Sequence, residues 1–87
     1  MSVDPFHVDV TWRAISPRLR VAIEGACTPK QVHVVMLHAA GYGPREASRY
    51  LGVTHRAFIK SREAALTRIR FEMVTKPPIR EGGLIND

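Results

Sequence analysis

The stretch Ala47-Ser48-Arg49-Tyr50-Leu51-Gly52-Val53-Thr54 decides the expected fold of this chain. Gly52 supplies the left-handed backbone conformation that a tight turn between two helices requires. Thr54 can cap the next helix by accepting a hydrogen bond from a backbone N–H two or three residues further on. Because Ala47 and Ser48 are small, the two helices can approach closely. The stretch therefore predicts a helix-turn-helix.

Outward from this turn, start and stop signals predict where the other helices begin and end. Proline at the first helical position follows a Ser or Thr cap at Ser16-Pro17 and at Thr28-Pro29. The expected helices run from Trp12 to about Gly25, from Thr28 to about Ala40, from Pro44 to Leu51 and from Thr54 to about Val74. We expect one small all-α, four-helix domain over residues 12–74, between an N-terminal arm (1–11) and a flexible C-terminal tail (75–87). The arm is predicted to be extended, because its apolar residues alternate.

Helical spacing also predicts which side chains are buried. The predicted buried sets are Leu19, Ala22 and Ile23, then Val32, Val35, Met36 and Ala39, and in the last helix Phe58, Ala65, Ile69 and Met73. On the opposite face of the last helix we expect Arg56, Lys60, Glu63 and Thr67.

Positive charge is concentrated on the predicted helix-turn-helix. The formal net charge is +5, and residues 28–74 hold eight Lys or Arg against three Glu, whereas the flanking segments are balanced. A focused basic excess attracts polyanions such as nucleic acids. A solvated basic face that only keeps the protein soluble is the alternative.

Several classes of protein are not favoured by the composition. Cys27 is the only cysteine, and no secretory signal or membrane-spanning run is recognisable, so we expect a cytoplasmic, nucleoid-associated protein. The carboxylates are scattered, and no catalytic triad or glycine-rich phosphate loop is evident. His33, His38 and Cys27 lack the spacing of a metal site. We therefore expect no enzyme activity, no metal and no cofactor.

Residues 17–71 resemble region four of bacterial sigma factors, and LuxR-type helix-turn-helix domains share much of the pattern. The resemblance is carried by Thr28-Pro29-Lys30-Gln31 and the apolar run Val34 to Leu37, then by Arg45-Glu46, Leu51-Gly52-Val53-Thr54, Ala65-Leu66 and Ile69-Arg70 at family spacing. It implies a promoter-binding helix-turn-helix domain. The chain holds no counterpart of the other sigma regions, so a stand-alone domain, encoded by a phage or mobile element, is expected rather than a complete sigma factor.

Carried over position by position, the resemblance implies base contacts at His55, Arg56, Ile59 and Lys60. Ile59 departs from the family, because primary sigma factors typically have an arginine there. Phosphate contacts are expected at Lys30, Arg45, Arg49 and Thr54. A surface ion pair with Glu46 is the alternative for Arg49.

Two functions remain open from the sequence. The first is a DNA-binding transcription regulator that acts as a homodimer on double-stranded DNA, with the dimer contact in the stretch Phe6 to Trp12 or at Ile69, Phe71 and Met73. The second is a sigma-like interaction module that docks on RNA polymerase or another partner without reading DNA, which Ile59 favours. An architectural DNA-binding role that tolerates any sequence is a third possibility.

Overall fold

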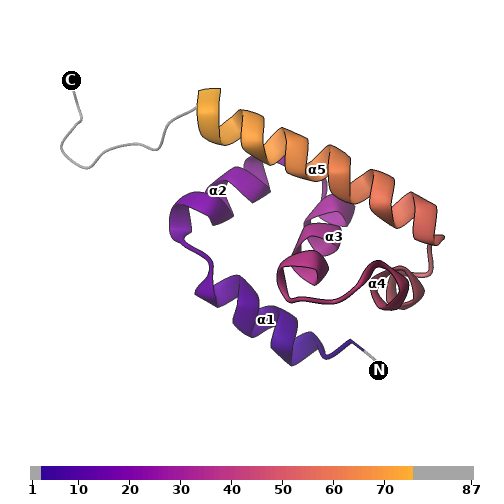
Figure 1. The fold of residues 1–87 in the computed structure, drawn as a ribbon. Helices are drawn as coiled ribbons and strands as arrows, with labels where there is room; N and C mark the ends of the chain where they lie inside the picture. The colour runs from indigo at the N-terminus through magenta and orange to yellow at the C-terminus, as the bar shows by residue number, and fades with distance from the viewer. Residues whose placement is uncertain (1–2, 76–87) are drawn as a thin grey trace, which may run out of the picture.

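The computed structural model describes residues 3–75, and every regular element in that range is an α-helix (Figure 1). The five helices are α1 (Pro5–Ala14), α2 (Pro17–Ala26), α3 (Pro29–Ala39), α4 (Pro44–Leu51) and α5 (His55–Thr75). The all-α prediction is confirmed. The tail predicted for residues 75–87 lies outside the described residues, apart from Thr75 at the end of α5.

The predicted caps of α2 and α3 are present. Ser16 Oγ accepts a hydrogen bond from the Leu19 N–H at 3.3 Å. Thr28 Oγ1 accepts from the Gln31 N–H at 3.2 Å, and Gln31 Oε1 accepts from the Thr28 N–H at 3.1 Å. This reciprocal pair is a capping box, which satisfies two backbone donors that the helix itself leaves unpaired.

The prediction of an extended N-terminal arm is wrong, because α1 occupies Pro5–Ala14. Asp4 Oδ1 caps this helix by accepting from the Phe6 N–H at 3.0 Å. The pair Asp4-Pro5 is the same start signal as Ser16-Pro17. The helix expected from Trp12 is therefore two helices, which are separated at Ile15 and Ser16.

Helix α5 lies across α2, α3 and α4, while α1 packs on α3 away from α5 (Figure 1). Two groups of buried side chains hold this arrangement together. The first core cluster consists of Val3, Val34, Leu37, Ala47 and Phe58, and the second consists of Ala22, Ile23, Val35, Ala65 and Ile69. Helix α3 contributes to both clusters, so it is the centre of the fold.

This central position explains why some residues of α3 that were predicted to be buried are not. Four successive residues, Val34 to Leu37, are buried, whereas Val32 is only half-buried and Ala39 is exposed. A helix that packs on one neighbour buries one stripe. Because α3 contacts all four other helices, it buries most of its circumference in the middle.

In α5 the predicted inner face is largely confirmed. Phe58, Ala65 and Ile69 are buried, and Met73 is half-buried against the second core cluster. Helix α5 buries a single stripe because all its neighbours lie on one side of it.

Helix α1 is held at its N-terminal end by two polar contacts. The Tyr42 hydroxyl accepts from the Asp4 N–H at 3.0 Å, and His7 Nε2 donates to the Ala40 carbonyl at 3.0 Å. The rings of His7 and Tyr42 meet edge to face.

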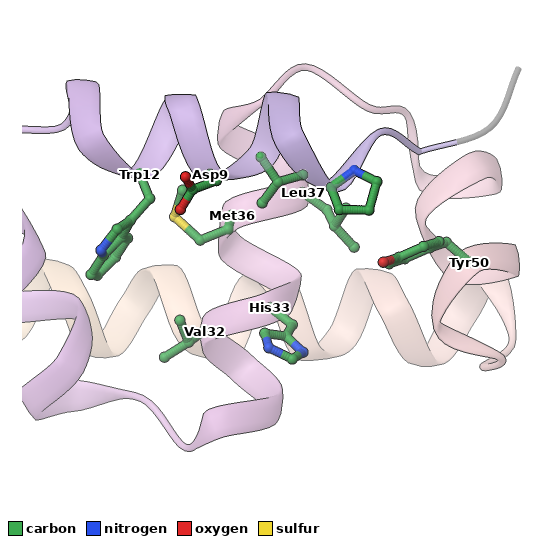
Figure 2. A pocket seen from close by; sticks show the side chains of 9 residues that line it. Asp9, Trp12, Val32, His33, Met36, Leu37 and Tyr50 are labelled. Carbon is green, nitrogen blue, oxygen red and sulfur yellow. The ribbon is translucent and has the colours of Figure 1, made fainter.

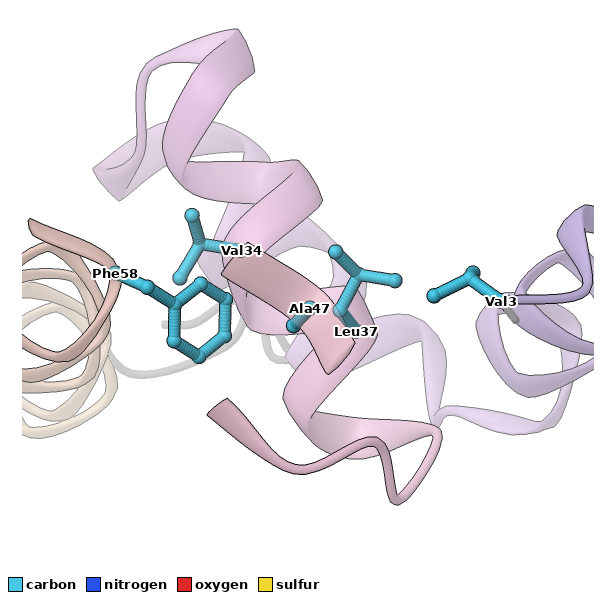
Figure 3. Close-up of a cluster of buried hydrophobic side chains, with 5 residues drawn as sticks. All are labelled: Val3, Val34, Leu37, Ala47 and Phe58. Carbon is cyan, nitrogen blue, oxygen red and sulfur yellow. The ribbon is translucent and has the colours of Figure 1, made fainter. Parts of the chain in front are cut away.

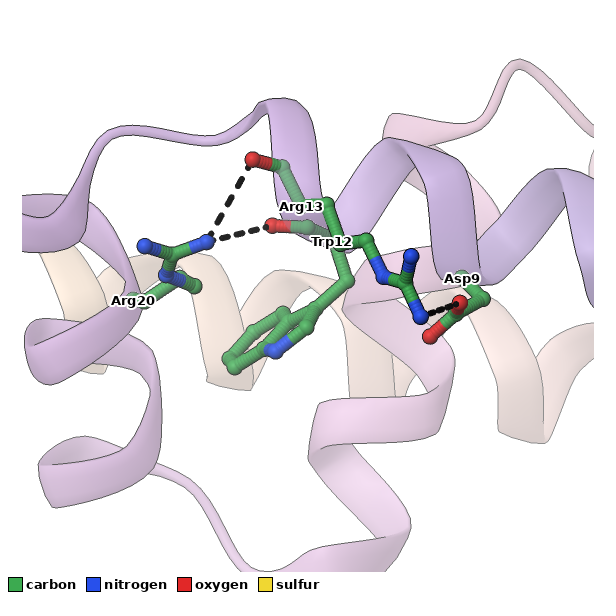
Figure 4. Close-up of polar contacts among 4 residues, drawn as sticks. All are labelled: Asp9, Trp12, Arg13 and Arg20. Carbon is green, nitrogen blue, oxygen red and sulfur yellow. Dashed lines mark hydrogen bonds and ion pairs between the residues drawn. The ribbon is translucent and has the colours of Figure 1, made fainter.

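At its C-terminal end, α1 is joined to α2 through Arg20. One guanidinium nitrogen donates to the backbone carbonyls of Trp12 and Arg13, at 3.3 and 3.4 Å (Figure 4). These carbonyls belong to the last turn of α1, where the N–H groups four residues further on no longer continue the helix. The Trp12 carbonyl also accepts from the Ile15 N–H at 3.3 Å. Arg20 thus caps α1 from the next helix.

Candidate nucleic-acid interface

Helices α4 and α5 are joined by the turn that Gly52 makes possible. Gly52 has φ +71° and ψ +31°, in the left-handed region. The Val53 N–H donates to the Ser48 carbonyl at 3.0 Å, and the Gly52 N–H donates to the Arg49 carbonyl at 3.2 Å. These bonds close the last turn of α4. Thr54 Oγ1 then accepts from the Ala57 N–H at 3.0 Å and caps α5, as predicted.

Small side chains let α4 approach its neighbours closely. Ala47 is fully buried, and Figure 3 shows it between Phe58 of α5 and Leu37 of α3. Ser48 is also buried, and its hydroxyl donates to the Arg45 carbonyl at 3.1 Å, which satisfies the one polar group that this packing hides. The helix-turn-helix is therefore anchored by the first core cluster.

Three of the four predicted base-contact residues are exposed at the start of α5. His55 is the first residue of the helix, and Arg56 and Lys60 lie one turn apart on the face opposite Phe58. Glu63 lies on the same exposed face one turn after Lys60. Glu63 therefore places a negative charge on this face directly after the two basic residues.

Ile59 has a different environment from the other three. It is half-buried and packs against the first core cluster. Part of its side chain therefore stabilises the fold, and its role in base contact stays a prediction.

The predicted phosphate contacts fall into two groups. Arg45 and Arg49 are exposed on α4, and Thr54 is exposed at the turn. The Thr54 oxygen accepts the cap hydrogen bond, so its hydroxyl hydrogen is still able to donate. Lys30 is also exposed, but it lies in the first turn of α3, outside the helix-turn-helix.

Only some of the residues predicted to contact a second copy of the chain are exposed. Ile69 is buried in the second core cluster, so the prediction that it contacts a partner is wrong, and Met73 is half-buried against the same cluster. The large exposed apolar side chains near the predicted segments are Phe6, Val10, Phe71 and Val74.

Cys27 follows α2 and is half-buried against the second core cluster. Burial raises the pKa of its thiol, and the nearby Arg68 guanidinium lowers it by less. The thiol is therefore neutral near pH 7 and has little nucleophilic character. Within residues 3–75, no three His, Cys, Asp or Glu side chains gather in a way that could hold a metal ion.

Comparison with models of protein families, with curated proteins and with solved structures finds no match for this chain. None of the described helices combines the length and apolar character needed to cross a membrane.

Proposed function

We propose that this chain is a DNA-binding transcription regulator whose α5 enters the major groove by its first two turns. One observation carries the proposal. Arg56 and Lys60 are exposed side by side on α5, while Phe58 on the opposite face anchors the helix in the core. A recognition helix needs this combination of a fixed inner face and a basic outer face.

Arg56 and Lys60 can donate hydrogen bonds to guanine O6 and N7 in the major groove. A good bidentate contact contributes about 1–3 kcal/mol of discrimination between bases. His55 at the start of α5 can donate or accept, depending on its tautomer.

The four residues predicted to contact phosphates would position the protein on the DNA backbone. Arg45 and Arg49 extend from α4, which precedes the recognition helix, and Thr54 lies between the two helices. Lys30 would add a phosphate contact from α3. Such contacts set the register of the protein and carry no sequence information of their own.

A single short recognition segment reads few base pairs, so the proposal includes a homodimer on paired half-sites. Phe71 and Val74 near the end of α5, and Phe6 and Val10 on α1, are exposed and apolar and could form the contact between copies.

The proposal is tested by fluorescence anisotropy of a labelled random-sequence duplex pool titrated with the protein at low and moderate salt. We expect salt-sensitive binding that is lost in the double variant Arg56→Ala/Lys60→Ala. The control is Arg13→Ala/Arg18→Ala, which removes the same charge from exposed positions on α1 and α2. Equal losses in the two double variants would indicate attraction by net charge alone.

Absence of binding at low salt would overturn the DNA-binding proposal. It would favour the second function, in which the domain docks on RNA polymerase or another protein. A contact of that kind, formed by apolar side chains, would weaken little with salt.

A further inference from the structure

A cleft of about 300 Å³ lies where α1, α3 and α4 meet (Figure 2). Its walls are mainly apolar. Val8 and Trp12 line it from α1, and Val32 and Met36 line it from α3. In Figure 2 the Trp12 ring lies at one end of the cleft, and Tyr50 extends from α4 toward the other end.

Two polar side chains of the lining are free to bind a ligand. No hydrogen bond or ion pair joins the side chain of His33 or Tyr50 to another described residue. The third polar group, the Asp9 carboxylate, is paired with the Arg13 guanidinium at 3.0 Å (Figure 4). The cleft therefore offers hydrogen-bonding groups without an unpaired carboxylate.

Helix α1 forms one wall of the cleft, and it is attached to the rest of the fold by half-buried side chains and by polar contacts at its ends. None of the residues of α1 is fully buried. The helix is held at its ends, by Tyr42 and Ala40 at one and by Arg20 at the other. Between these ends, Val8 packs against the first core cluster and Trp12 against the second, and both side chains also line the cleft.

We propose that this cleft binds a small, uncharged aromatic molecule that carries one hydroxyl or N–H group. Its volume is at the lower end of the range for small-molecule sites, which are mostly apolar with a few polar groups that orient the ligand. The Trp12 ring and the Met36 thioether favour an aromatic ligand. A hydroxyl or N–H on the ligand would donate to His33 or to the Tyr50 oxygen.

Charge and size argue against other occupants. The Asp9 side chain is 48% exposed, so solvent screens its attraction for a cationic ligand, which would gain little there. A space of about 300 Å³ matches a small molecule, whereas a helix about 10 Å across could place only single side chains in it. A bound molecule would touch α4 through Tyr50, but its binding does not depend on the proposed DNA-binding function.

The test is a ¹H–¹⁵N NMR titration of the protein with 2-naphthol as the probe, up to the solubility limit of the probe. We expect saturable shifts confined to the cleft, including the indole N–H of Trp12, which is the only tryptophan in the chain. In Val32→Phe the larger side chain occupies the cleft, and affinity falls by about tenfold or more. Val21→Phe, the same change at an exposed site on α2, should leave affinity unchanged.

A second variant keeps the test decisive if Val32→Phe perturbs folding. His33 is exposed, so His33→Ala should fold normally and weaken 2-naphthol binding by several-fold. The proposal is overturned if no saturable shifts occur or if the shifts spread over unrelated exposed apolar residues. It is also overturned if His33→Ala and a folded Val32→Phe both bind as tightly as the unchanged protein.

Discussion

At the scale of single residues, the left-handed backbone conformation of Gly52 restricts which residues the turn between α4 and α5 accepts. Its φ of +71° lies in a region that side chains with a Cβ adopt at a cost, although the space around it is open. We expect Gly52→Ala to lower the free energy of unfolding by about 1–2 kcal/mol. Urea denaturation followed by circular dichroism measures the change.

Gly25→Ala is the matched control for Gly52→Ala. Gly25 lies inside α2, and a Cβ there would meet the Glu72 carboxylate at 3.4 Å, an ordinary contact distance. Alanine in a helix interior should stabilise the protein by about 0.5–1 kcal/mol. Equal effects of the two substitutions would contradict the role of the left-handed turn.

At the scale of elements, the packing of α4 on its neighbours depends on the small side chain of Ala47. We expect Ala47→Leu to destabilise the fold by about 1–3 kcal/mol, because no space exists for the added atoms. The same change at exposed Ala64 on α5 should alter stability by less than about 0.5 kcal/mol. Thermal unfolding of the two variants compares them directly, and similar midpoints would exclude tight packing at Ala47.

Helix α1 is attached to the rest of the fold in part by the hydrogen bond between Tyr42 and Asp4. Tyr42→Phe removes the hydroxyl that accepts the Asp4 N–H, and we expect a loss of about 0.5–1.5 kcal/mol. Tyr50→Phe removes a hydroxyl that has no hydrogen-bond partner among residues 3–75, and it should be nearly neutral. Hydrogen exchange of α1 amides should accelerate in the first variant only; unchanged exchange there would mean that this bond does not hold α1.

At the scale of the whole molecule, the proposal assigns some basic residues to DNA bases and others to phosphates. We expect Arg45→Ala/Arg49→Ala to weaken binding to all sequences about equally, because both residues are assigned to phosphates. The slope of log K against log salt should fall by about 2, since each phosphate contact contributes about 0.9. Anisotropy at several salt concentrations measures it, and a selective loss on a subset of sequences would show instead that these arginines read bases.

Local signals in the sequence were sufficient to predict the turn between α4 and α5 and the caps of α2, α3 and α5. A glycine in the left-handed region and a hydroxyl cap act within a few residues, so Gly52, Thr54, Ser16 and Thr28 could be assigned correctly. The exposed positions of Arg56 and Lys60 followed from the 3.6-residue period, because α5 has neighbours on one side only. The cap that starts α1 was equally local, at Asp4-Pro5, but the alternating apolar residues after it favoured an extended arm.

The sequence by itself determined the helical class, three of the caps, the turn at Gly52 and the inner face of α5, since each depends on neighbours along the chain. Only the tertiary structure decided that α3 is buried around most of its circumference, that Ile69 is not available to a partner, and that α1 leaves a cleft beside Trp12. These features depend on which helices meet. The contacts that fix them, such as that between Asp4 and Tyr42, join residues far apart in the chain and leave no local pattern.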